Sequence, residues 1–117
     1  MASKKTISAT QVETYETLVP LIESLHRDLK DLSRKSQNQH LSKPRVEMIN
    51  RLLNRTKGLL KEEASSEFLD ALDEDLLPQN ADAMIVLGQY KAALDRFKER
   101  YTEIDAYDEE TWKVRGR

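Results

Sequence analysis

The chain has no cysteine and little glycine or proline, and each shortage excludes a class of structure. Without cysteine, disulfide bonds and thiolate chemistry, whether for metal binding or for catalysis, are excluded. Three glycines and three prolines in 117 residues provide too few turn signals for a fold of many strands. The composition therefore favours a helical domain without disulfide bonds.

Long apolar runs are also missing. The longest, at residues 83–87, is far too short to span a bilayer. The N-terminal residues lack the apolar core of a signal peptide. From these features and the missing cysteine we expect a soluble, cytoplasmic protein that has no membrane partner.

Apolar residues recur at spacings of three and four in three long segments, which predicts three amphipathic helices. The segments lie between residues 18 and 32, between 46 and 60, and between 83 and 104. Their apolar stripes are wider than the two positions per heptad of a two-stranded coiled coil. Together with a length typical of one domain, this predicts an all-α fold, a single antiparallel helical-bundle domain over residues 1–117.

Capping residues mark the expected ends of the first two helices. The first should begin at Ser8 or Thr10, because each starts a capping-box pattern in which two side chains satisfy free backbone N–H groups. A polar run follows the first helix and predicts a loop. Ser42 is expected to cap the second helix, which should end near Glu63.

The acidic segment after the second helix predicts a fourth, short helix. Ser65 or Ser66 is expected to cap this helix, and Pro78 to end it, because proline lacks the N–H that a helix needs. This helix would be the fourth and shortest element of the bundle, and it would lie between two long helices in the chain. Its apolar face would carry Phe68, Leu69, Leu72, Leu76 and Leu77.

The last helix should begin with Asn80 as its cap and end near Ile104. Residues 105–117 have no apolar period and are expected to form a tail, which is either free or docked. Tyr107 and Trp112, the only tryptophan, lie in this tail within an acidic and then basic stretch. They are candidate anchors for a partner, because one buried aromatic side chain can dominate an interface. The alternative is that Trp112 folds back and plugs one end of the bundle.

Charge is segregated along the chain, although the net charge is only −2. Residues 27–61 carry ten Lys/Arg and three Asp/Glu, a net charge of +7, and residues 62–82 carry eight Asp/Glu and no base, a net charge of −8. Either the two blocks neutralise each other within the bundle, or each faces a partner. The candidate partner-binding residues in them are Arg45, Arg51, Arg55, Lys57, Lys61, Asp70, Asp73, Glu74 and Asp75.

Simpler interpretations of these charges stay open. The bases can be ordinary solvated helix faces, paired with acids one turn away. Asp73, Glu74 and Asp75 lack the glycine and the spaced oxygen ligands of an EF-hand loop, so we expect no metal site. At the C-terminal end of the predicted short helix, these three acids would oppose the helix dipole. We therefore expect them to face a basic group in this chain or in a partner.

Five residues separate Arg34 from His40. This spacing resembles the Arg-x(4–6)-His pattern of HEPN-type ribonucleases, which are small all-α domains. The resemblance covers these two residues and implies that Arg34 holds a phosphate while His40 moves a proton. The alternative, which we expect, is that His40 is a solvated loop residue.

The sequence contains no phosphate-binding loop, nucleophile elbow or zinc-ligand spacing. We therefore predict no catalytic residue and no cofactor. The predicted function is a small soluble protein-interaction module, an adaptor or regulatory subunit, that binds another protein through charge-segregated helical faces. One alternative is a nucleic-acid-binding protein that uses the basic second helix, or the HEPN-like ribonuclease. Another is a bundle that assembles with copies of itself.

Overall fold

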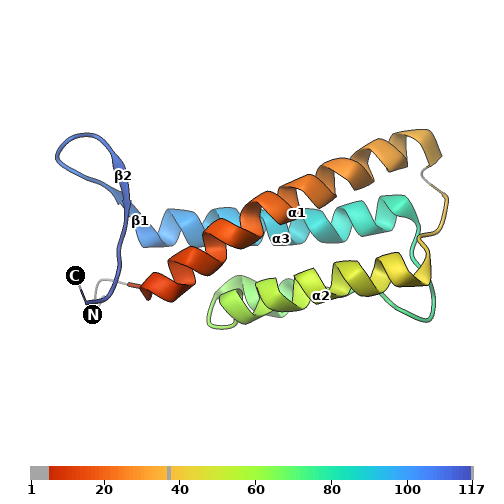
Figure 1. The fold of residues 1–117 in the computed structure, drawn as a ribbon, viewed down its shortest axis with the longest axis horizontal. Coiled ribbons are helices and arrows are strands. Elements are labelled where there is room, and N and C mark those ends of the chain that lie inside the picture. The colour runs from red at the N-terminus through yellow and green to blue at the C-terminus, as the bar shows by residue number, and fades with distance from the viewer. Residues whose placement is uncertain (1–5, 37, 117) are drawn as a thin grey trace.

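The computed structural model describes residues 6–36 and 38–116. The chain is mostly helical and elongated, with principal extents of 49 × 26 × 23 Å. Figure 1 shows α1 crossing α3, with α2 beside them and two strands beyond the end of α3. The elements in chain order are α1 (Ala9–Ser36), α2 (Lys43–Leu60), the 3-10 helix η1 (Ala64–Phe68), α3 (Asn80–Tyr101), β1 (Thr102–Ile104) and β2 (Glu110–Trp112). The three helices expected from the apolar period are present, whereas the small sheet was not predicted.

Side-chain caps explain where the first two helices begin. At the start of α1, the N–H of Ser8 donates to Gln11 Oε1 (2.9 Å) and the N–H of Gln11 donates to Ser8 Oγ (3.1 Å), which confirms the capping box. Ser42 Oγ accepts the backbone N–H three residues later (3.4 Å) and caps α2, as predicted. This helix ends at Leu60, three residues before the predicted Glu63.

The start of α3 differs from the prediction, because Asn80 is not its cap. Gln79 occupies the N-cap position and makes no side-chain cap. Asn80 is buried, and its Nδ2 donates to the carbonyl of Ser36 (3.1 Å) while its N–H donates to the carbonyl of Gln39 (2.9 Å). Asn80 therefore ties the start of α3 to the end of α1.

The three helices share one core, in which each helix contacts the other two. The largest fully buried apolar side chains come from all three helices; they are Ile22, Leu29, Val46, Ile49, Leu53, Leu60, Leu87, Tyr90 and Phe97. Burial of one such aliphatic or aromatic side chain contributes about 1.5–3 kcal/mol. This core fixes the position of α3, which supplies most residues of the candidate site.

The predicted fourth helix is absent, and that prediction was wrong. Only η1, five residues long, is helical in this region, and residues 69–79 form an irregular segment that we call the strap. The side-chain amide of Asn50 explains the difference, because its Oδ1 accepts the N–H of Leu72 (3.0 Å) and its Nδ2 donates to the carbonyl of Leu72 (2.8 Å). A continuing α-helix would use both of these backbone groups for its own hydrogen bonds.

The apolar pattern assigned to that helix is only partly buried. Leu69 and Leu72 are buried and hold the strap against the helices, whereas Phe68 is 71% exposed and Leu76 is 77% exposed. An exposed phenylalanine leaves a large apolar area in water. Its surroundings are therefore of functional interest.

The C-terminal region forms a β-hairpin where a helix end and a tail were expected. Helix α3 ends at Tyr101 instead of near Ile104, and β1 pairs antiparallel with β2, which lies within the predicted tail at 105–117. Ile7 extends this small sheet through a parallel bridge to Val114. The hairpin is thereby joined to the segment that precedes α1.

Candidate protein-interaction site

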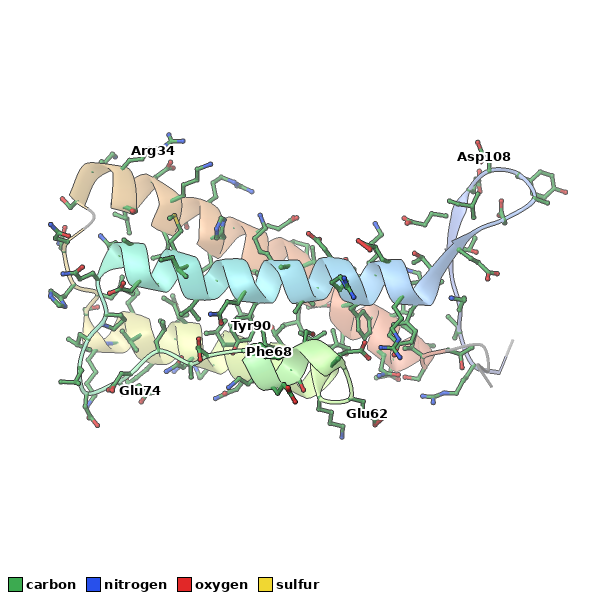
Figure 2. All side chains as sticks on the ribbon, turned by 180° about the vertical axis from the view of Figure 1, so that it is seen from behind. Arg34, Glu62, Phe68, Glu74, Tyr90 and Asp108 are labelled. Carbon is green, nitrogen blue, oxygen red and sulfur yellow. The ribbon has the colours of Figure 1, made fainter. Side chains whose placement is uncertain are left out.

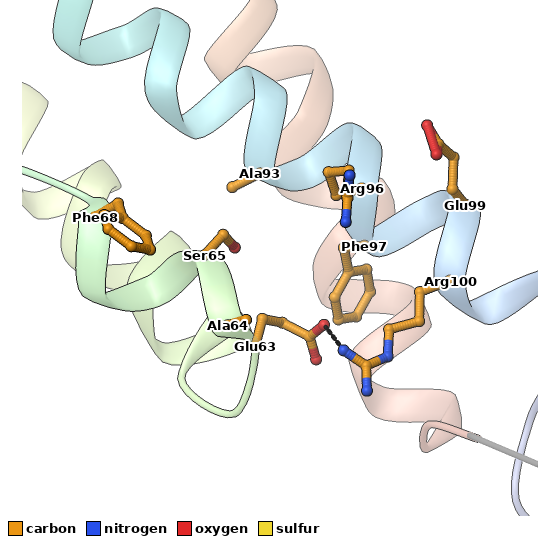
Figure 3. Close-up of a pocket in the computed structure, with 9 residues that line it drawn as sticks. All are labelled: Glu63, Ala64, Ser65, Phe68, Ala93, Arg96, Phe97, Glu99 and Arg100. Atoms are coloured by element: carbon orange, nitrogen blue, oxygen red, sulfur yellow. Dashed lines mark hydrogen bonds and ion pairs between the residues drawn. The ribbon is translucent and has the colours of Figure 1, made fainter. Parts of the chain in front are cut away.

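An open groove of about 750 Å³ lies between η1 and the C-terminal half of α3 (Figure 3). Ala93 and Phe97 are buried and form the floor of the groove, and Phe68 lies on its η1 side. The remaining lining residues are Glu63, Ala64, Ser65, Arg96, Glu99 and Arg100. The groove therefore combines an apolar floor with two arginines.

Local structure explains why these residues meet. Positions 93, 96, 97 and 100 follow the spacing i, i+3, i+4, i+7 and share one face of α3. On the other side of the groove, the chain turns directly after α2, where the N–H of Glu63 donates to the carbonyl of Leu60 at 2.8 Å. This turn places η1 opposite the same face of α3.

Glu63 is an anionic residue whose charge is compensated within the chain. Its Oε1 lies 3.4 Å from Arg100 Nη1, and its Oε2 accepts a hydrogen bond from the Tyr101 hydroxyl at 2.7 Å. Burial first, and then the hydrogen bond and charge of Glu63, raise the pKa of Tyr101. The Tyr101 phenol therefore stays a hydrogen-bond donor at neutral pH, and Glu63 joins the start of η1 to the end of α3.

Arg96 is the cation of the groove that has no acidic partner among the residues that the structure describes. Among residues 6–36 and 38–116, the ion pairs are Arg34 with Asp31, Lys98 with Glu110, and Arg100 with Glu63. Arg96 is exposed, and Figure 3 shows the carboxylate of Glu99 directed away from η1. A guanidinium can bind a carboxylate through two parallel hydrogen bonds. The groove thus suits an apolar side chain that lies next to an acidic group.

The five basic residues predicted to contact a partner do not form one patch. Arg51 and Arg55 lie about one turn apart on the side of α2 that carries Met48, which is 47% exposed. Lys57 follows Arg55 by two residues and therefore projects from the opposite side. Within the described ranges none of the five forms an ion pair. The exposed members are Arg45, Arg51, Arg55 and Lys61, and Lys57 is partly buried.

Two of the predicted acidic residues hold the strap in place. Asp70 Oδ2 accepts a hydrogen bond from Gln89 Nε2 (2.9 Å), and the N–H of Asp70 donates to Gln89 Oε1 (3.0 Å). Glu74 Oε2 accepts from Asn50 Nδ2 at 3.0 Å. Figure 2 shows Glu74 at one end of the molecule, away from Phe68. These acids therefore contact side-chain amides of α2 and α3.

Asp73 stabilises a turn within the strap. Its Oδ1 accepts the N–H groups of Leu76 and Asp75, both at 2.8 Å, and these hydrogen bonds lower the pKa of Asp73. Because no helix ends here, the expectation that Asp73, Glu74 and Asp75 oppose a helix dipole was wrong. In the part of the chain that the structure describes, no ion pair joins these acids to the bases of α2.

Arg34 and His40 make separate contacts. Arg34 Nη1 lies 3.9 Å from Asp31 Oδ1 within α1. His40 Nδ1 lies 2.6 Å from the carbonyl oxygen of Leu77, so this nitrogen donates to the strap. The contact gives His40 a structural role between the α1–α2 connection and the strap. The ribonuclease alternative stays a prediction.

The two aromatic residues predicted as anchors have opposite environments. Trp112 packs against the core, with ring centroids 5.0 Å from Tyr15 and 6.4 Å from Phe97. The structure agrees with the alternative in which Trp112 folds back onto the helices. Tyr107 is 86% exposed in the loop between β1 and β2.

The loop that carries Tyr107 is ordered by its own hydrogen bonds. Asp105 Oδ1 accepts the N–H groups of Tyr107 (2.8 Å) and Glu109 (3.0 Å), and the N–H of Asp105 donates to the carbonyl of Glu109 (2.8 Å). Asp108 has a φ of 64°, in the left-handed region that aspartate tolerates better than most residues. We call residues 103–110 the hairpin tip.

Sequence reasoning missed the groove because its residues had other predicted roles. Phe68 was assigned to the apolar face of the short acidic helix, and Phe97 lies within the apolar segment between residues 83 and 104 that predicted the last helix. One signal was available, since Arg96 and Arg100 lie one turn apart on either side of Phe97. No pattern in the sequence indicated that Phe68 is exposed, because its exposure depends on the absence of the fourth helix.

Comparisons with models of protein families, with curated proteins and with solved structures found no significant match. Within residues 6–36 and 38–116, no three histidine, aspartate or glutamate side chains are grouped so that they could hold a metal ion. No helix in the described ranges has the length and apolar character needed to cross a bilayer. The geometry of the groove is therefore the basis for a functional proposal.

Proposed function

We propose that this chain is a small, non-catalytic protein-interaction module, an adaptor or regulatory subunit, whose groove binds a protein partner. The observation that carries the proposal is the exposure of Phe68 beside a groove that has Phe97 in its floor. Large exposed apolar patches mark interaction sites, and aromatic and arginine side chains are enriched among the residues that contribute most to binding. In this proposal the helices act as an antiparallel bundle that supports the groove, and the module works in the cytoplasm.

The chemistry of the groove indicates what the partner presents. An apolar side chain between Phe68 and Phe97 would remove apolar surface from water, which contributes about 25 cal/mol per Å². An adjacent carboxylate would pair with Arg96, and a charge pair that is covered on binding contributes to the selection of the partner. The groove therefore fits a short segment in which an apolar residue has acidic neighbours.

Photo-crosslinking tests this proposal in the native cells of the protein. With p-benzoylphenylalanine in place of Phe68, we expect a discrete adduct with a second protein chain, because this position faces the partner. The same crosslinker in place of Leu76, which is similarly exposed on the strap, should give no discrete adduct. Equal adducts at both positions would contradict the proposal.

A charge reversal provides the matched control. Arg96→Glu should remove most of the adduct at position 68, because it places a carboxylate where the partner presents one. Arg27→Glu makes the same change on the exposed side of α1 and should leave the adduct unchanged. Circular dichroism verifies that both variants keep their helices. An adduct that survives Arg96→Glu would show that the groove is not the site.

The arginines of α2 support one alternative, a nucleic-acid-binding protein. Arg51 and Arg55 are exposed, lie on one side of the helix, and have no ion pair with any residue in the described ranges. Micromolar or tighter binding to mixed RNA or DNA at physiological salt, weakening steeply as salt is added, would favour this alternative over ours. RNA cleavage that disappears in His40→Ala would favour its ribonuclease form.

A further inference from the structure

The hairpin tip, residues 103–110, has the chemistry that the groove requires. It presents Tyr107, 86% exposed, and Ile104, 62% exposed, among five acidic residues and no base. We infer that the hairpin tip of a second copy of this chain occupies the groove, so that two copies form a symmetric dimer. This inference rests on the proposed function of the groove and names its partner.

The charges of the two surfaces are complementary. Two of the five acids in the tip are used within the chain, because Asp105 orders the loop and Glu110 pairs with Lys98 at 3.2 Å. The other three acids have no ion pair among residues 6–36 and 38–116; they are Glu103, Asp108 and Glu109. Arg96 of the groove lacks an ion pair in the same ranges. Opposite charges at matching surfaces accelerate association and select the partner.

The tip is ordered before it binds. Asp105 holds both Tyr107 and Glu109 by hydrogen bonds of 2.8 and 3.0 Å, and the loop ends are joined by the β1–β2 ladder. Binding therefore restricts the Tyr107 side chain and little of its backbone. A preorganised loop loses less conformational entropy on association than a flexible one, so more of the contact free energy remains as affinity.

The position of the tip excludes its own groove as the binding site in this structure. Figure 2 shows Asp108 beyond the end of α3, whereas Phe68 lies near the middle of the molecule. A two-fold axis would place each tip against the groove of the other copy and form two identical contacts. Stable interfaces bury roughly 1,200–2,000 Å², and two reciprocal contacts bury twice the area of one.

Light scattering during size-exclusion chromatography tests the dimer over a concentration series. The measured mass of the wild-type protein should rise from that of one chain to that of two chains, and no further, as the concentration increases. Tyr107→Ser and Phe68→Ser should each weaken this association roughly tenfold or more, because each removes an aromatic anchor. Leu76→Ser removes a comparably exposed apolar side chain outside the contact and should have no effect.

Mixing two defective variants distinguishes this arrangement from other dimers. Tyr107→Ser chains have no functional tip and Arg96→Glu chains have a reversed groove, so each variant alone should be monomeric. Their mixture keeps one intact contact, between the tip of the Arg96→Glu chain and the groove of the Tyr107→Ser chain. Mixed dimers should therefore form at concentrations at which neither variant associates alone, and they should be weaker than wild-type dimers, which have both contacts. Mixing that fails to restore association would overturn the inference.

The remaining outcomes separate this inference from the proposed function. A wild-type chain that stays monomeric at all concentrations, or a dimer that Tyr107→Ser leaves intact, overturns the inference. If a position 68 adduct with a different protein persists in that case, the proposed function stands. An adduct between two copies of this chain, lost in Tyr107→Ser, supports both.

Discussion

The strap and the hairpin are the two longest non-helical segments of the described ranges, and they are held in different ways. Side chains of neighbouring helices hold the strap, because Asn50, Gln89 and Tyr90 all hydrogen-bond to its backbone. The hairpin has its own backbone ladder and is attached to the helices through Trp112. The strap therefore depends on polar side chains distant in sequence, whereas the hairpin depends on aromatic packing.

The largest effect should come from the aromatic attachment of the hairpin. Trp112→Ala should destabilise the chain by about 3 kcal/mol, because the packing against Tyr15 and Phe97 is lost. Chemical denaturation measures the change. Tyr107→Ala, in the same hairpin but exposed, should change the free energy of unfolding by less than about 0.5 kcal/mol. If the two variants lost similar amounts of unfolding free energy, Trp112 would not be the attachment of the hairpin to the helices.

Asn50→Ala should destabilise the strap by about 2 kcal/mol, because it leaves the buried N–H and carbonyl of Leu72 without partners. Asn54→Ala, on the exposed side of α2, is the matched control and should have a small effect. Hydrogen exchange locates the change, since the Leu72 amide should lose protection while the hairpin amides keep theirs. Loss of protection in both regions would mean that the two are not independently held.

Alkaline pH should lower the free energy of unfolding by a smaller amount, through one tyrosine beside the strap and one beside the hairpin. Burial, followed by the charge of Asp70, raises the pKa of Tyr90 to about 12, and its hydroxyl donates to the carbonyl of Asp70 at 2.7 Å. Burial first, and then nearby acidic side chains, raise the pKa of Tyr15 beside Trp112 to about 12 as well. The pKa of each tyrosine in the folded state exceeds the ordinary value of 10.0. The contribution of each tyrosine to the free energy of unfolding is therefore complete below pH 10 and is lost as the pH rises toward 12.

Single substitutions separate the two contributions to this alkaline loss. Tyr90→Phe should remove the part that affects the strap, at a cost of about 1 kcal/mol for the lost hydrogen bond. Tyr15→Phe should remove the part that affects the hairpin. Unfolding free energies measured as a function of pH give the result, and an unchanged pH dependence in Tyr90→Phe would assign the loss to other groups.

The helices could be predicted from the sequence because their signals are local. Apolar spacing located all three, and the hydroxyls of Ser8 and Ser42 correctly marked two starts. The strap could not be predicted in this way. Its leucines fit a helical period, and the competing hydrogen bonds come from Asn50, 22 residues away from Leu72 in the chain. Tertiary contacts of this kind override local propensity.

The candidate site was less predictable than the fold. The bases of α2 were visible in the sequence, but helix geometry distributes them over different sides. The groove needs Phe68 to be exposed, which follows only once the strap leaves the helical path. Tyr107 was predicted to be an anchor for a partner, and this stays a prediction; its exposed position depends on the turn that Asp105 forms. That turn had no Asn-Gly or Asp-Gly signal.

The bridge between Ile7 and Val114 has a consequence for how the chain folds. The N–H of Ile7 donates to the carbonyl of Lys113 (3.0 Å), and the carbonyl of Ile7 accepts the N–H of Arg115 (2.8 Å). A ribosome synthesises the chain from its N-terminus, so Ile7 is made long before these partners exist. Contacts between residues so distant in sequence form slowly. Ile7 therefore cannot make these two hydrogen bonds until residues 113–115 have been synthesised and have left the ribosome.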